Sequence, residues 1–183
     1  MCKKELTKIS FVLSVLLLSF FSRSFSQQIQ SSREYQIKAV FLFNLTQFVE
    51  WPKNSFDNDQ APLIIGIIGK DPFGVYLDEV ISGEKINDHT ISIQHFAQVD
   101  DIKTCHILFV NTESDVEEKI LTGVKGRNIL TVGDTKDFIK RKGMLRFVTE
   151  NNKTKIQINM EAVTGTELTI SSKLLRLAEI VSP

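Results

Sequence analysis

The chain has 183 residues, of which 42% are hydrophobic and 24% charged, and its 22 basic and 22 acidic side chains give a formal net charge of zero. This length suits one domain with a sizeable buried core. The balanced charge lacks the basic excess that nucleic acid or anionic membrane would require, so neither class of partner is expected.

The first 26 residues have the layout of a secretory signal peptide. A basic start precedes the apolar run ISFVLSVLLLSFF, residues 9–21, and the small residues Ser24 and Ser26 follow it. The run is shorter than the roughly 20 residues of a membrane-spanning helix, so we predict cleavage after Ser26 rather than an uncleaved anchor. The leader holds four basic residues and one acidic residue, which leaves 18 basic and 21 acidic side chains in residues 27–183, a net charge of about −3.

Cysteine chemistry is not expected in the exported domain. Only Cys105 remains after cleavage, so no internal disulfide can form. Cys105 stands beside the apolar run HILFV, which favours a buried structural thiol over a nucleophile or redox group. An intermolecular disulfide is the remaining alternative.

The segment YQIKAVFLFNLTQFVEWP, residues 35–52, predicts a core helix. Its apolar residues recur at spacings of three and four. Polar residues such as Lys38 and Asn44 interrupt the segment, so it cannot span a membrane. Ser31 or Ser32 is expected to cap the helix, and Pro52 is expected to end it at Trp51.

Alternating strands and helices follow. Continuous apolar runs at residues 62–69, 106–110 and 128–132 predict buried parallel strands, and residues 89–96 predict a strand with one polar face. Three helices are expected between them: residues 73–83 with Val75, Leu77, Val80 and Ile81 inward, residues 114–124 capped by Ser114, and residues 134–143.

The C-terminal part changes pattern. Residues 143–159 predict two antiparallel strands that turn around residues 150–152. Residues 169–181 predict a helix capped by Ser171 or Ser172, with Leu174, Leu175, Leu177 and Ala178 inward. Together the elements indicate a single α/β domain, with a mostly parallel sheet flanked by helices and a C-terminal antiparallel hairpin.

No catalytic, metal or cofactor site is expected. The histidines His89, His95 and His106 have no acidic partner at a metal-ligand spacing, so they are interpreted as structural. Cys105 and His106 are neighbours on a strand and therefore point to opposite faces, which prevents a nucleophile–base pair. The phosphate-binding, dinucleotide-binding and nucleophile-elbow motifs are absent from the sequence.

The loop GKDPFG, residues 69–74, has two interpretations. It joins a buried strand to a helix, where α/β sheets tend to bind ligands, so Lys70, Asp71 and Gly74 are candidate residues of an anion or small-ligand site. The simpler alternative makes Asp71 a helix cap, with Pro72 as the first helical residue.

Two stretches are candidate partner surfaces. Trp51 and Phe56 place aromatic anchors at a helix end and on a polar loop, although Trp51 could instead close the core. Lys140, Arg141 and Arg146 form a basic cluster in an acidic domain, which could pair with acidic groups on a receptor or be a solvated helix end.

Several segments, in this order and spacing, resemble the YfiR-like family of exported proteins: IKAVFLFNLTQFVEWP, IIGKDPFG, CHILFV, NILTVGD, GMLRFV, KIQIN and ISSKLLRLAEIV. The resemblance covers residues 35–181. The best-known members form disulfides, whereas this chain keeps Cys105 alone, so it departs from their redox control.

The resemblance implies a periplasmic, homodimeric α/β regulator that binds and represses the sensor region of an inner-membrane signalling protein. That partner would be a diguanylate cyclase, whose release raises cyclic di-GMP and promotes biofilm, or another receptor such as a histidine kinase. Two other functions remain open from the sequence: a periplasmic sensor of a small molecule, and an exported enzyme.

Overall fold

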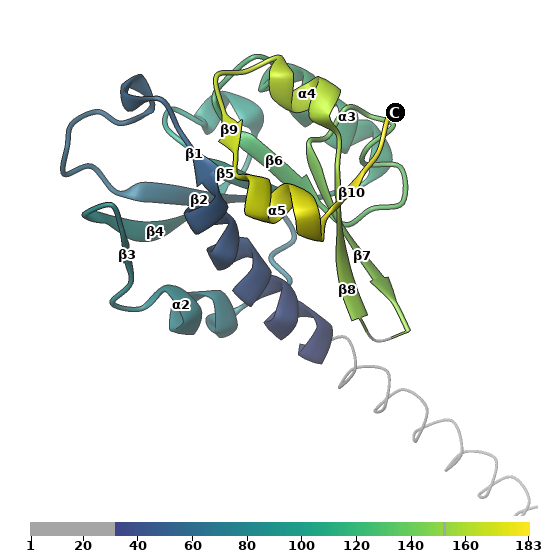
Figure 1. Ribbon diagram of the computed structural model, residues 1–183, viewed down its shortest axis with the longest axis horizontal. Coiled ribbons are helices and arrows are strands. Elements are labelled where there is room, and N and C mark those ends of the chain that lie inside the picture. The colour runs from purple at the N-terminus through teal and green to yellow at the C-terminus, as the bar shows by residue number, and fades with distance from the viewer. Residues whose placement is uncertain (1–31, 152) are drawn as a thin grey trace, which may run out of the picture.

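A central eight-stranded sheet organises the molecule (Figure 1). The computed structural model describes residues 32–151 and 153–183, so the predicted signal peptide, its cleavage site and a cap at Ser31 lie outside the described residues. The strands run in the order β10, β8, β7, β6, β5, β2, β4, β3. Their bounds are Leu63–Gly69 (β2), Lys85–Ile86 (β3), His89–Phe96 (β4), Ile107–Asn111 (β5), Leu130–Gly133 (β6), Leu145–Glu150 (β7), Lys153–Ile158 (β8) and Glu179–Ile180 (β10).

Neighbouring strands are parallel except β7 with β8 and β3 with β4. The predicted class, a mostly parallel α/β sheet with a C-terminal antiparallel hairpin, is therefore confirmed. β10 adds a parallel strand outside that hairpin, which the sequence did not indicate. A separate two-stranded antiparallel sheet joins β1, Val49–Glu50, to β9, Thr169–Ile170.

Helices cover both faces of the sheet (Figure 1). Residues 32–48, here called the first helix, share one core cluster with α2 (Val75–Ile81), α4 (Met160–Thr164) and α5 (Ser172–Leu177). α3, Ser114–Gly123, packs into a second cluster on the other face. Successive residues of a strand point to opposite faces and so belong to different clusters. Ile67 and Phe109 pack in the cluster of the first helix, whereas Ile68 and Leu108 pack in the cluster of α3.

The first helix ends at Phe48, three residues before the predicted end at Trp51. Val49 pairs with Ile170 and Glu50 with Thr169, and the Ser171 amide donates a 2.8 Å hydrogen bond to the Phe48 carbonyl. Strand pairing, rather than Pro52, therefore stops the helix. None of the helices within residues 32–151 and 153–183 is long and apolar enough to cross a membrane.

Residues 134–143 form successive turns and not the predicted helix. The buried Phe138 ring lies between Gly133 and Gly143, where added Cβ atoms would come within 2.4 Å and 2.2 Å of it. The chain wraps around this ring, and Lys142 takes a left-handed φ of 67°. The packing of the chain around the Phe138 ring therefore overrides the local helical pattern.

Several details of the smaller helices were also predicted wrongly. Ser114 is the first residue of α3, whose N-cap is Glu113. Val75 and Leu177, the first residue of α2 and the last of α5, were expected to point inward but are 65% and 75% exposed. The buried residues are Leu77 and Ile81 in α2 and Leu174 in α5. The cap at Ser171 is confirmed, since its hydroxyl accepts from the Leu174 amide.

Candidate functional site

Four aromatic side chains meet at the amino-terminal edge of the parallel strands, and we call them the aromatic cluster: Trp51, Phe56, His89 and His106. The Phe56 ring stacks 4.1 Å from the His89 ring and 4.3 Å from the His106 ring, centroid to centroid. The Trp51 ring lies edge-on to His106 at 5.8 Å. The structure therefore brings together the two aromatic residues that the sequence singled out and adds two histidines.

The local fold explains this placement. After Trp51 the chain turns through a short 3-10 helix, η1 (Lys53–Ser55), which returns Phe56 over the sheet. The Trp51 indole donates a 3.0 Å hydrogen bond to the His106 carbonyl, so Trp51 is anchored to the core. Trp51 and Phe56 are both half-buried and pack against the main core cluster. Both residues therefore help to close the core at this edge, and each keeps part of its surface exposed.

His106 is held neutral. Its Nδ1 accepts a 2.9 Å hydrogen bond from the Ile64 amide, which puts the ring proton on Nε2. Burial, and to a smaller extent the neighbouring His89, lower the pKa of His106 to about 4. A fully buried, neutral imidazole between two aromatic rings is a structural group.

We expect His106 to make the protein acid-sensitive. Because its pKa falls from 6.5 to about 4 on folding, the unfolded chain binds more protons between these values. The stabilisation is complete above pH 6.5 and is lost as the pH falls toward 4, by roughly 3 kcal/mol. Denaturant unfolding of His106→Asn, whose side-chain oxygen can replace Nδ1, should lose this part of the pH dependence. The exposed His95→Gln should keep it, and equal pH profiles for His106→Asn and the parent would contradict the assignment.

Two cavities flank the loop that carries Phe56. One, of about 340 Å³, is bordered by Trp51, Phe56, His89 and Leu63, with Glu50 and Lys53 among its polar groups. The other, of about 380 Å³, is bordered by Asn54, Ser55 and Asp57 of the same loop and has a mostly polar lining. Both sit at the amino-terminal edge of the sheet, whereas the candidate ligand site in the sequence, the GKDPFG loop, lies at the carboxyl-terminal edge.

The carboxyl-terminal edge is filled by the protein's own side chains. The buried Lys38 ammonium lies 2.6 Å from Asp134 Oδ2 and 2.6 Å from Glu34 Oε1. The Tyr35 hydroxyl donates to the same Asp134 oxygen at 3.0 Å. Burial and the Asp134 carboxylate raise the pKa of Tyr35, so it stays a donor. In the sequence Lys38 only interrupted an apolar helix, and its pairing partner lies 96 residues away.

The GKDPFG loop caps itself. Asp71 Oδ1 accepts from the amides of Phe73, at 2.8 Å, and Gly74, at 3.3 Å. α2 begins at Val75 with Gly74 as its N-cap, so the prediction of Pro72 as the first helical residue is wrong. A carboxylate therefore already accepts from the Phe73 and Gly74 amides at the candidate anion site of Lys70, Asp71 and Gly74. Asp71 Oδ2 also lies 2.9 Å from His95 Nε2.

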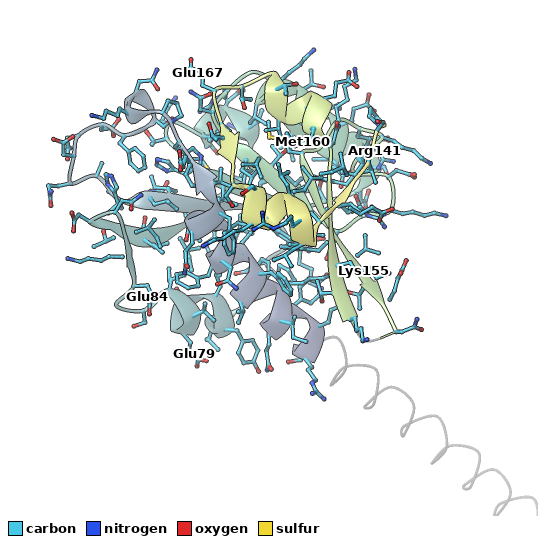
Figure 2. The ribbon with its side chains drawn as sticks, in the orientation of Figure 1. Glu79, Glu84, Arg141, Lys155, Met160 and Glu167 are labelled. Carbon is cyan, nitrogen blue, oxygen red and sulfur yellow. The ribbon has the colours of Figure 1, made fainter. Side chains whose placement is uncertain are left out.

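The three basic candidates do not form one patch. Arg141 donates a 3.0 Å hydrogen bond to Glu117, a carboxylate with no exposed surface. Lys140 is exposed and pairs with Asp137 at 2.9 Å, and Arg146 donates to Gln157 at 3.2 Å. Figure 2 shows Arg141 on the side of the molecule away from β3 and β4. Lys140 is the member of the set whose charge faces solvent.

Reactive groups are not assembled in the part of the chain that the structure describes. The Cys105 thiol lies 3.1 Å from the Ile107 carbonyl, and burial raises its pKa to about 12. Such a thiol is protonated at neutral pH and therefore a poor nucleophile. No group of three or more His, Cys, Asp or Glu side chains within residues 32–151 and 153–183 could hold a metal ion.

Comparison with known proteins places this fold in context. A family model described as YfiR/HmsC-like matches residues 35–179. No curated protein matches the sequence. A solved structure, the ABC domain in complex with L-Trp from Streptococcus pneumonia, aligns with a TM-score of 0.46 and 9% identity. That alignment covers 65% of this chain and 55% of that chain, so it spans little more than half of the length of that protein.

Proposed function

Because the chain belongs to the YfiR/HmsC-like family, we propose that it is an exported periplasmic regulator that binds and represses the sensor region of an inner-membrane diguanylate cyclase. The match of the family model over residues 35–179 carries this proposal. Under this proposal the protein acts by binding rather than by catalysis. Its release from the cyclase raises cyclic di-GMP. The homodimer that the resemblance implies stays a prediction.

The surface of the first helix supports a binding role. Ile37 and Val40 lie three residues apart on this helix and are 37% and 46% exposed. The chain runs from this helix directly into Trp51 and Phe56, whose rings are half-buried at the edge of the sheet. Aromatic and aliphatic anchors at a partly exposed edge are typical of the centre of a protein interface. We therefore propose that the partner contacts the first helix and the loop that follows it.

Affinity capture after crosslinking in the native host tests this surface. Val40→Asp should abolish capture of a membrane-spanning cyclase, because a buried carboxylate without a partner opposes binding. Lys53→Glu, on the exposed side of the loop beside the aromatic cluster, should weaken capture. Trp51→Ala would not separate binding from folding, since the Trp51 indole also donates a hydrogen bond to the core.

The chain offers matched controls on the other face of the sheet. Val116 on α3 is 47% exposed, nearly equal to Val40, and Lys119 is exposed on the same helix. Val116→Asp and Lys119→Glu should leave capture unchanged. Equal losses for Val40→Asp and Val116→Asp would place the interface elsewhere, and failure of the folded parent protein to capture any membrane protein would refute the proposed function.

A further inference from the structure

The polar cavity beside the Phe56 loop has the size of a small-ligand site. Its volume of about 380 Å³ falls within the roughly 300–1,000 Å³ usual for such sites. Three segments border this open cavity: residues 54–57, residues 103–105 before β5, and residues 126–129 before β6. The site is independent of the GKDPFG loop, which lies at the opposite edge of the sheet.

Positive charge and hydrogen-bond donors dominate this cavity. Lys103 and Arg127 both border it, and Asp57 is the one acidic residue among its described lining. Arg127 Nη2 donates to the carbonyls of Ile102 and Lys103, each at 2.9 Å. These two bonds fix the guanidinium in place and leave its other N–H groups free for a ligand.

Neutral donors complete the set. Asn128 Oδ1 accepts from the Glu167 amide, which leaves the Asn128 NH₂ group to donate. The Ser55 hydroxyl is buried and has no hydrogen-bond partner among the described residues. A buried hydroxyl without a partner costs free energy. Rotation of the Ser55 side chain toward the cavity would let the hydroxyl donate to an acceptor oxygen of a ligand and would remove that cost.

We propose that this cavity binds a small oxyanion, a phosphate or a carboxylate, through Arg127, Lys103 and the Ser55 hydroxyl. The two cations neutralise the ligand, and the fixed guanidinium sets its orientation. The cavity is bordered by Ser55 and Asp57, the two neighbours of Phe56 in the chain, so ligand binding restrains the loop that carries Phe56. This ligand site does not depend on the regulatory role proposed above.

Titration with inorganic phosphate, followed by amide chemical shifts in NMR, tests the proposal directly. At fixed ionic strength, saturable shifts are expected in residues 54–57, 103–105 and 126–129. Lys103→Gln should weaken phosphate binding about tenfold, since it removes a charge-assisted bond. Lys119→Gln makes the same change of charge on α3 and should bind phosphate as the parent does. Citrate in place of phosphate shows whether carboxylates are also accepted, and saturation by either anion supports the site.

Ser55→Ala separates binding from folding. Without phosphate this variant should melt at the same temperature as the parent or higher, because it removes an unsatisfied buried hydroxyl. With phosphate it should bind more weakly. The proposal is overturned if neither phosphate nor citrate gives saturable shifts at about 50 mM, or if the shifts spread equally to the exposed lysines of the β7–β8 hairpin. Unchanged affinity in both Lys103→Gln and Ser55→Ala would also overturn it.

Discussion

Arg141→Met is expected to destabilise the protein by about 3–5 kcal/mol, because it leaves a buried carboxylate without its charged partner. Glu117 has no exposed surface and is held by two groups, the Arg141 guanidinium at 3.0 Å and the Thr135 hydroxyl at 2.6 Å. The Thr135 bond alone cannot offset the loss of hydration of a negative charge. Urea unfolding of the purified variant measures the effect.

The neighbouring residue supplies the control. Lys140 is 73% exposed and its partner Asp137 is 39% exposed, so Lys140→Met should change stability by less than about 1 kcal/mol. Glu117→Gln combined with Arg141→Met should recover part of the loss, since the buried group is then neutral. Equal, small effects of Arg141→Met and Lys140→Met would mean that Arg141 is a surface charge, free for a partner as its sequence position suggested.

Phe138→Ala is expected to cost about 3–5 kcal/mol, because the ring is fully buried and fills the space that the turns of residues 134–143 enclose. Gly143→Ala should cost roughly 1–3 kcal/mol by itself, since its Cβ would meet the Phe138 ring at 2.2 Å. In the Phe138→Ala background the same change should cost almost nothing. This non-additivity is the diagnostic result of a double-mutant cycle.

The cycle also tests why residues 134–143 are not helical. If Gly143→Ala is equally destabilising with and without the Phe138 ring, the glycine is required for another reason and the turns do not form around the ring. The matching substitution at Gly165, where an added Cβ would meet its nearest atom at 3.4 Å, should be tolerated in both backgrounds.

Elements whose pattern reflects their burial were predicted well from the sequence. β2, β5 and β6 lie inside the sheet and are buried on both faces, so each is a continuous apolar run. The hairpin of β7 and β8 was recognised because its turn residues are local. Features that depend on distant partners were missed. The β1–β9 pair joins residues more than 100 positions apart, and it determines where the first helix ends.

The same limit applies to the candidate site. Trp51 and Phe56 stood out because aromatic residues at a helix end and in a polar loop are locally unusual. His89 and His106 could not be assigned to them, since the stacking depends on how β4 and β5 lie in the sheet. Arg141 looked like surface charge in the sequence, and only the fold shows the buried Glu117 on α3 that it neutralises.

The most direct measurement of the central claim is the cellular level of cyclic di-GMP in the native host with and without this protein. If the protein represses a diguanylate cyclase from the periplasm, deletion should raise cyclic di-GMP. The full-length chain should restore the lower level, whereas a chain that lacks residues 1–26 should not. An unchanged level after deletion, or full restoration by the chain without residues 1–26, would contradict the account.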